Sequence, residues 1–194
     1  MAENKKEKML YIDTSVRNPE RTRSFIKTLL SFNQQVLTDD VALGVETNLI
    51  MNGLYRINDA NIPKKDSYTE SEVKKIMDDN PQDHSQGGFR GYASRFSTHY
   101  FNMNQYGYVF CEKDQKILIG ETGRKLAGLK EEEKTKMQML HLSALAHWQT
   151  PNPFSANLSK TSPLSLLLRL IKKNIDEEGR GIHKREIPII MCWN

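Results

Sequence analysis

The sequence contains (Asp/Glu)-x-Lys tripeptides, a pattern that metal-dependent nucleases use to hydrolyse phosphodiesters. In such sites carboxylates hold Mg²⁺ and the lysine helps to activate the attacking water. The residue types at 114–116 (Asp-Gln-Lys) fit this pattern, but they fall in a predicted hairpin turn. Nuclease sites instead place the tripeptide on an apolar strand. The tripeptides at 72–74 and 132–134 fall on polar helices. We therefore expect no catalytic residue in this chain.

Metal ligands and catalytic nucleophiles are not indicated by residue spacing. His141 and His147 are six residues apart, about 240° around a helix, so they do not share a face. Neither Cys111 nor Cys192 has a second Cys or a His at the spacing of a zinc site. The sequence has no nucleophile elbow and no phosphate-binding glycine loop. We expect surface or capping histidines and no metal bound by this chain.

Arginines are concentrated in "TSVRNPERTRSF", residues 14–25, where the first helix is predicted to start. Asn18 and the proline after it suit the N-cap and the first position of a helix. Arg17, Arg21 and Arg23 are not needed to start a helix, and they place three guanidinium groups around one exposed end. Guanidinium groups pair with phosphate and with guanine, so this end is a candidate for contact with nucleic acid.

Positive charge is also concentrated between Arg90 and Lys130. The chain has 28 Lys and Arg against 24 Asp and Glu, a net charge of +4, and a sequence pI near 9.0. Seven basic residues against three acidic ones lie between Arg90 and Lys130. Clustered basic charge is the footprint expected of a nucleic-acid-binding surface.

The composition indicates a soluble protein. The chain has 194 residues, enough for one medium domain, with 38% hydrophobic and 27% charged residues. No run approaches the ~20 apolar residues of a membrane span, and the first residues lack the apolar region of a secretory signal. Two isolated cysteines fit a reducing compartment. We expect a cytoplasmic location and no contact with a membrane.

Apolar residues at helical spacing predict helices at both ends of the chain. One begins at Pro19, a second follows Thr38 as N-cap, and the others cover residues 69–80, 131–148 and 162–174. In the last one, a buried stripe is expected at one face and two lysines at the C-terminal end. These residues are Leu164, Leu167, Leu168 and Ile171 for the stripe, and Lys172 and Lys173 for the end.

Residues 89–128 carry the most regular pattern. Tyr92, Phe96, Tyr100 and Met103 recur at helical spacing, and the first three are expected in the core. The apolar runs "YVFCE" and "KILIG", separated by "KDQ", predict a β-hairpin, and "TGRKLAG" predicts a helix capped by Thr122. Helix, hairpin and helix in this order are typical of a winged-helix unit. The predicted fold is therefore mainly α with a small β-hairpin and a winged-helix, helix-turn-helix-like DNA-binding architecture.

Four parts of the chain are expected. They are a tail at 1–13, an N-terminal helical part at 14–86, a winged-helix segment with packing helices at 87–180, and the start of a further element at 181–194. The middle boundary falls within "PQDHSQGG", residues 81–88, predicted as a flexible linker. The apolar ending "PIIMCW" suggests that another packed element follows, so we expect a fragment of a longer protein.

Several motifs follow one another in an order found in one family of restriction enzymes. They are "SVRNPER", "YGYVFCEKDQKILIGETGRKLAG", "AHWQTPNPF", "SPLSLLLRLIKK" and "REIPIIMCW". Together they resemble the N-terminal DNA-recognition region of AlwI-family type IIS restriction and nicking endonucleases, and more distantly that of FokI-like enzymes. The resemblance covers most of the chain except roughly residues 38–85, where no motif matches.

The resemblance implies a function for this chain and a division of labour in its parent. It implies winged-helix recognition of an asymmetric site in double-stranded DNA. A separate PD-(D/E)xK domain, which this sequence lacks, would use Mg²⁺ to cut the DNA nearby. This chain alone is then expected to bind DNA as a monomer, without a cofactor and without catalysis, and a cognate methyltransferase is expected as a genomic neighbour.

The resemblance also implies DNA-contacting residues. Those near the first helix are Ser15, Arg17, Asn18 and Arg21, with Arg17 suited to guanine and Asn18 suited either to adenine or to its helix cap. Those before and on the polar side of the patterned helix are Arg90, Arg95, Ser97 and Thr98, for phosphates or bases. Those beside the hairpin tip are Lys113 and Lys116, for phosphates.

Two other classes of protein fit the same residues. A winged-helix transcription regulator shares the order of helix and hairpin, but it predicts a two-fold dimer and a palindromic site. A structural or protein-interaction module, in which the charges are a solvated surface, predicts no binding to any duplex.

Overall fold

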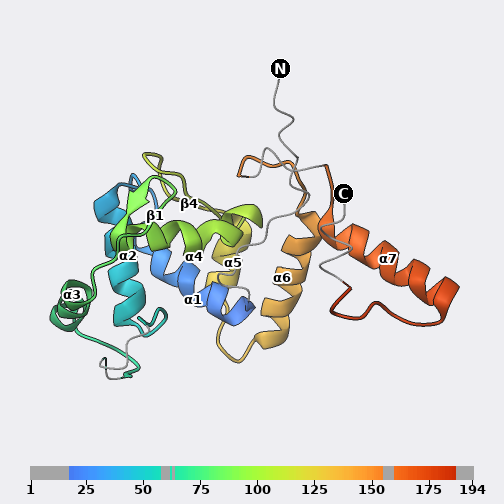
Figure 1. The fold of residues 1–194 in the computed structure, drawn as a ribbon, viewed down its shortest axis with the longest axis horizontal. Helices are drawn as coiled ribbons and strands as arrows, with labels where there is room; N and C mark the ends of the chain where they lie inside the picture. The colour runs from blue at the N-terminus through green and yellow to red at the C-terminus, as the bar shows by residue number, and fades with distance from the viewer. Residues whose placement is uncertain (1–17, 58–61, 63, 155–159, 187–194) are drawn as a thin grey trace, which may run out of the picture. The chain divides into compact units, whose positions relative to one another are not determined.

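The computed structural model describes residues 18–57, 62, 64–154 and 160–186, which form helices and two small antiparallel sheets (Figure 1). The helices are α1 (Pro19–Leu30), α2 (Asp39–Met51), α3 (Glu70–Asp79), α4 (Ser94–Gln105), α5 (Glu121–Gly128), α6 (Lys134–His147) and α7 (Pro163–Glu178), with a 3-10 turn η1 (Gly91–Ala93). The strands are β1 (Ser85–Gln86), β2 (Phe89–Arg90), β3 (Val109–Phe110) and β4 (Leu118–Ile119). The prediction of a mainly α fold with a small hairpin is confirmed.

The chain divides into two compact units, one from Asp13 to Leu140 and one that takes in His141–Asn194. The first, called here the larger unit, contains α1 to α5, both sheets and the start of α6. Among the described residues, no helix combines the length and the apolarity needed to cross a lipid bilayer. The predicted tail at 1–13 lies outside the described residues, as do residues 187–194.

Side chains cap the first three helices where the sequence predicts that they begin. The Oδ1 atom of Asn18 accepts a hydrogen bond from the backbone N–H of Glu20 at 2.7 Å. Thr38 accepts from a first-turn N–H of α2, and Thr69 forms a reciprocal capping box with Glu72 at the start of α3. Each bond satisfies an N–H group that has no partner inside its helix.

A segment between α1 and α2 pairs with the predicted hairpin. Strands β3 and β4 are antiparallel, as expected. On the other edge of the strand that leads into β4, Lys116 forms an antiparallel bridge with Val36. The N–H of Gln34 also donates to the carbonyl of Ile117 at 2.8 Å. The larger unit therefore has a small three-segment arrangement with residues 34–37 at one edge and β3 at the other, which sequence periodicity did not predict.

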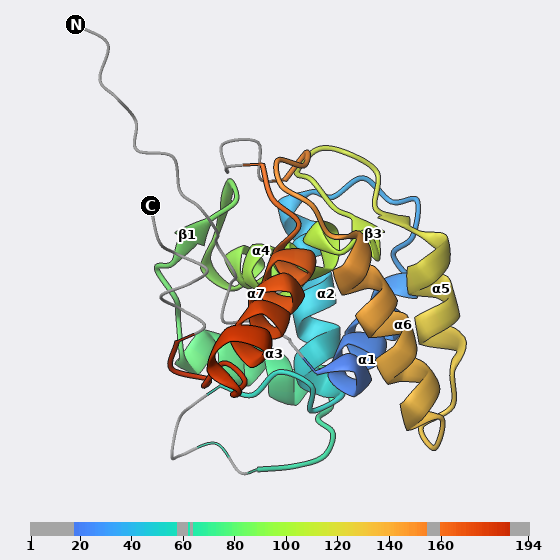
Figure 2. The same ribbon diagram turned by 90° about the vertical axis from the view of Figure 1, so that its right-hand side faces the viewer.

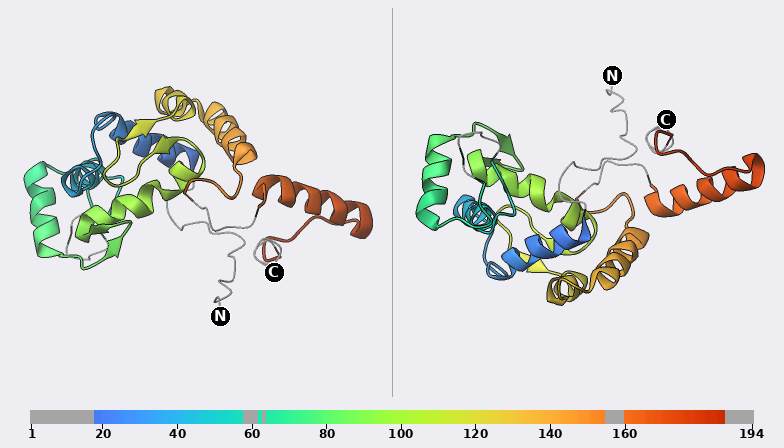
Figure 3. Two further views of the ribbon diagram at one scale, coloured as in Figure 1. Left: turned by 90° about the horizontal axis from the view of Figure 1, so that it is seen from above. Right: turned by 90° about the horizontal axis from the view of Figure 1, so that it is seen from below.

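The core of the larger unit lies where α1, α2 and α4 meet. α1 and α2 contact each other (Figure 2), and α3 packs on α2 at the edge of the unit (Figure 3). Phe25 and Leu49 are fully buried. On α4, the rings of Phe96 and Tyr100 stack with centroids 4.6 Å apart, and both side chains are buried together with Tyr92. The prediction that these three aromatic residues belong to the core is confirmed.

The segment predicted as a flexible linker, residues 81–88, instead contains β1. Strands β1 and β2 form a hairpin in which Ser85 lies opposite Arg90. The turn consists of Gly87 and Gly88, with φ angles of 61° and 81°. Two successive residues with positive φ match the twist of a two-residue hairpin, so the glycines form a defined turn.

Two predictions about helix ends were wrong. The N-cap of α5 is Gly120, and Thr122 lies inside the helix. α7 does not end near its lysines but continues to Glu178, so its last turn is acidic. Nor is its predicted stripe buried, because Leu168 is 56% exposed and the other three residues are half-buried. The described structure therefore covers this face of α7 only in part.

Candidate nucleic-acid interface

Three candidate residues in the first turns of α4 form hydrogen bonds with the β1–β2 hairpin and the residues just before it. The Nε atom of Arg95 donates to Oε1 of Gln82 at 2.7 Å. The hydroxyl of Thr98 donates to Oε1 of Gln86 at 2.7 Å, and that of Ser97 donates to the Gln86 carbonyl at 3.4 Å. These three side chains are half-buried. Their first function is therefore to hold the hairpin against α4.

Lys113 reaches the same hairpin from the loop between β3 and β4. Its Nζ atom lies 2.6 Å from the carbonyl oxygen of Gly88 and 2.8 Å from Oδ2 of Asp39. It also lies 4.8 Å from the centre of the Phe89 ring. Because Asp39 offsets its charge, Lys113 is less free to bind phosphate than its expected place beside a hairpin tip suggested.

We name the resulting surface the hairpin face. It combines β1–β2 with the start of α4 and the β3–β4 loop. It consists of Gln82, Gln86, Arg90, Arg95, Ser97, Thr98 and Lys113.

Arg90 is the most accessible cation of the hairpin face. It is exposed, and no described residue forms an ion pair with it. It lies on the lining of a cleft of about 610 Å³ between α2 and α3. Four carboxylates also line this cleft, those of Asp39, Asp40, Glu70 and Asp78. Repulsion by these carboxylates would restrict a phosphate to the side of Arg90 that faces away from the cleft.

Of the other candidates near the first helix, Asn18 and Arg21 make their described contacts with residues outside the hairpin face. Ser15 and Arg17 lie outside the described residues. The side-chain oxygen of Asn18 caps α1, which is the second of the two roles expected for this residue. The guanidinium of Arg21 is exposed, donates to the carbonyl of Leu54 at 2.8 Å and lies 5.3 Å from the Phe25 ring centre.

Lys116 has an exposed side chain on the strand that leads into β4, and its backbone bridges Val36. This position holds the backbone in place and leaves the side chain in solvent. Lys116 thus meets the requirement for a phosphate contact more directly than Lys113 does.

Sequence reasoning missed a buried pair that joins α2 to α4. Nδ1 of His99 lies 3.0 Å from each carboxylate oxygen of Glu46, which is fully buried. Burial raises the pKa of Glu46, against the hydrogen bond from His99 and the charges of His99 and Arg95. The rings of Phe25 and Tyr55 meet the imidazole edge to face. Glu46 follows Val45 on the buried side of α2. Its position in the helical repeat was the sequence feature that could have indicated its burial.

The Glu46–His99 pair fixes the middle of α4 against α2, and so it supports the helix that carries Arg95. A third metal-ligating side chain does not join it: among the described residues, no group of three or more His, Cys, Asp or Glu side chains is arranged to hold a metal ion.

Comparison with known proteins gave no match to this chain among family models, curated proteins or solved structures. The geometry of the described residues and the motifs of the sequence are therefore the basis for a functional proposal.

Proposed function

We propose that the larger unit is a winged-helix module that binds double-stranded DNA. A winged helix has the chain order helix, strand, helix, helix, strand, strand, with the first strand beside the last. α1, residues 34–37, α2, α4, β3 and β4 follow this order, and α3 with the β1–β2 hairpin forms an insertion before α4. The observation that carries the proposal is the pairing of Val36 with Lys116, because it sets the first strand beside the last.

The distribution of cations supports the same proposal. Arg90 and Arg95 flank the start of α4, and Lys113 and Lys116 lie in or beside the loop that corresponds to a wing. In such modules a helix or the wing approaches the duplex, while arginine and lysine hold phosphates and fix the register. Exposed Arg90 and Lys116 would bind phosphates, and Arg95 with Thr98 would orient the insertion that presents Arg90.

We further propose that this module is the recognition part of a type IIS restriction endonuclease. The support is the motif order that resembles AlwI-family enzymes, in which the longest motif coincides with β3, β4 and α5. Phosphodiester hydrolysis would then belong to a separate Mg²⁺-dependent domain of the parent protein. The present chain would contribute binding and the choice of site.

The direct test is duplex binding measured by fluorescence anisotropy as a function of salt. The logarithm of the association constant should fall with the logarithm of salt by about 0.9 per phosphate contacted. Arg90→Glu and Lys116→Glu should each weaken binding and reduce that slope by about 1. Arg169→Glu, on α7, is the matched control and should bind like the wild type.

The outcomes separate the three classes of function. Absence of duplex binding at low salt, or equal losses from Arg90→Glu and Arg169→Glu, would contradict the proposal. Selection from random duplexes should recover an asymmetric site. A palindromic site would instead favour a winged-helix transcription regulator, because a symmetric dimer reads a symmetric sequence.

A further inference from the structure

α7 carries a row of four apolar residues that the described structure leaves partly uncovered. Leu164, Leu168, Ile171 and Ile175 follow one another at intervals of four, three and four residues. This spacing keeps all four on one face, as in the seam of a coiled coil. Leu168 is 56% exposed and Ile175 is 51% exposed. Leu164 and Ile171 are half-buried, so part of every residue in the row remains open to a further apolar surface.

The charges of α7 run against its own helix dipole. Its first turn contains no acidic residue and its last turn contains no basic one. Asp176, Glu177 and Glu178 instead lie at the C-terminal end, where the dipole disfavours negative charge. The ion pair of Glu177 with Lys173, at 3.8 Å, is exposed and contributes little. Positive charge from outside the helix would stabilise this end.

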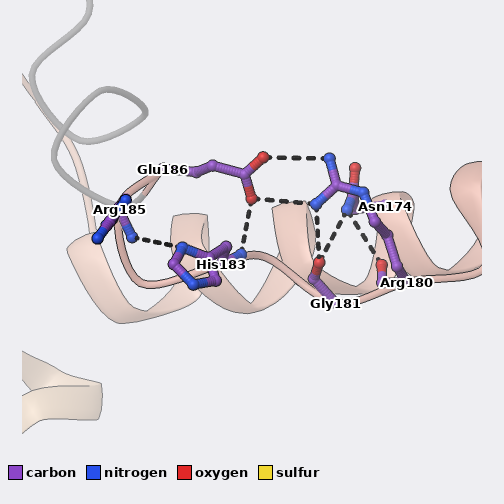
Figure 4. A network of polar contacts seen from close by, with 6 residues as sticks. All are labelled: Asn174, Arg180, Gly181, His183, Arg185 and Glu186. Carbon is purple, nitrogen blue, oxygen red and sulfur yellow. Dashed lines mark hydrogen bonds and ion pairs between the residues drawn. The ribbon is translucent and has the colours of Figure 1, made fainter.

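The C-terminal end of α7 is nevertheless well defined (Figure 4). Gly179 has a left-handed φ of 66°, and its N–H donates to the carbonyl of Ile175 at 3.0 Å. The side chain of Asn174 donates to the carbonyls of Arg180 and Gly181 at 3.0 and 3.2 Å. Arg180 then forms a bidentate pair with Glu186 at 3.1 and 3.2 Å. The helix therefore ends at a fixed point before any partner binds.

We propose that α7 pairs in antiparallel orientation with α7 of a second copy of this chain. Intervals of four, three and four read the same in both directions. A two-fold axis between residues 169 and 170 therefore sets Leu164 opposite Ile175 and Leu168 opposite Ile171. Every apolar residue of the row then meets an apolar residue of the second copy.

Charge selects the antiparallel orientation and the second copy as the occupant. In this arrangement the acidic end at 176–178 lies beside the N-terminus of the other helix, at Pro163, where unpaired N–H groups favour negative charge. A parallel pair would place the two acidic ends together. The same helix thus supplies both the acidic end and the positive end that complements it.

The pairing is small and therefore depends on concentration. A helix of 16 residues is about 24 Å long and offers about two heptads of seam. Two such helices bury less than the roughly 1,200–2,000 Å² of a stable interface, so the monomer predominates in dilute solution. The inference does not depend on DNA binding, because the contact uses no residue of the hairpin face.

Sedimentation velocity of the full chain without DNA tests the proposal. The wild type should associate with increasing concentration. Leu168→Glu and, independently, Ile175→Glu should raise the dissociation constant by about tenfold or more, since each buries a charge in the seam. Arg169→Glu introduces the same side chain outside the row and away from both helix ends, and should associate like the wild type. Circular dichroism would check that each variant keeps its helices.

Two outcomes would overturn the inference. One is a wild-type chain that stays monomeric at every concentration, as expected if α7 packs within its own chain. The other is equal association of Leu168→Glu and Arg169→Glu.

Disulfide crosslinking in a Cys192→Ser background tests the orientation. Leu164→Cys should crosslink with Ile175→Cys when the two variants are mixed and one carries a size tag. Crosslinking of each variant with itself, and not with the other, would contradict the antiparallel arrangement.

Discussion

α4 and α7 are two amphipathic helices that the sequence predicts equally well but that the protein uses differently. Every residue of α4 is buried or half-buried, whereas Pro163 is the buried residue of α7. α4 is contacted from α1 by Phe25 and from α2 by Glu46, and its N-terminus has no side-chain cap that would explain its formation. α7 instead has proline at its first position and glycine after its last.

The difference shows that an apolar stripe predicts a helix and which of its faces is apolar. It does not predict which residues cover that face. For α4 the covering residues come from other parts of the larger unit. For α7 we propose that a second copy supplies them. α4 should therefore depend on tertiary packing for its stability, and α7 on its local end structure.

The largest expected difference concerns the same substitution in the two environments. Leu49→Ala removes a fully buried side chain from the core around α4 and should lower the free energy of unfolding by about 2–5 kcal/mol. Leu168→Ala removes a side chain that is 56% exposed and should change it by about 0.5 kcal/mol or less. Urea unfolding of dilute protein, followed by circular dichroism, measures both. A loss at Leu168 as large as that at Leu49 would end the distinction between the two helices.

A glycine pair on α5 tests how tightly the larger unit is packed. A Cβ atom on Gly123 would lie 2.2 Å from the carbonyl oxygen of Tyr108, so Gly123→Ala should cost about 1–3 kcal/mol in stability. A Cβ atom on Gly128 meets no atom within 4 Å, so Gly128→Ala should be neutral or slightly stabilising. Thermal unfolding of the two variants gives the comparison. Equal melting temperatures would show that α5 can shift away from β3.

Local sequence patterns predicted the helices and much of the core, because both depend on residues close together in the chain. Asn18 and Thr38 identified two helix starts, and the spacing of Tyr92, Phe96 and Tyr100 identified the buried face of α4. These signals come from caps and periodicity, which require no knowledge of the partner element.

The missed features are pairings between distant residues. The bridge of Val36 with Lys116 spans 80 positions, and the contact of His99 with Glu46 spans 53. No local pattern marks such partners. The candidate site shows the same limit: Lys113 was placed beside the hairpin tip, but its contact with Gly88 depends on an unpredicted second hairpin, and its ion pair joins it to Asp39, 74 positions away on α2.

The pH dependence of stability tests the buried Glu46–His99 pair in the core. Burial raises the pKa of Glu46 above 4.5, so the folded chain keeps a proton that the unfolded chain has already lost. Its contribution to stability is thus complete below pH 4.5 and is lost as pH rises toward the folded pKa. The glutamine side chain of the Glu46→Gln variant does not ionise, so the variant does not lose stability in this way. As pH rises through this window, the free energy of unfolding of Glu46→Gln relative to the wild type should increase by at most about 1.4 kcal/mol per pH unit.

The matched control for this pH profile is Glu121→Gln on an exposed surface. A hydrogen bond from Lys125 lowers the pKa of Glu121, so its contribution is present above pH 4.5 and is lost as pH falls. The two variants should therefore differ from the wild type with opposite signs of slope. Identical slopes would show that Glu46 is not shielded from water.

The smallest expected effect separates two helices that begin at hydroxyl residues. Thr69 accepts a hydrogen bond from the backbone N–H of Glu72 at 3.3 Å at the start of α3, so Thr69→Ala should cost about 1 kcal/mol. Ser162 occupies the same position before α7 but makes no capping bond with its side chain, so Ser162→Ala should leave stability within about 0.5 kcal/mol of the wild type. Chemical unfolding measures both losses. If Ser162→Ala proved as costly as Thr69→Ala, a side-chain cap would form at α7 in solution, and its proline and glycine ends would not suffice to define the helix.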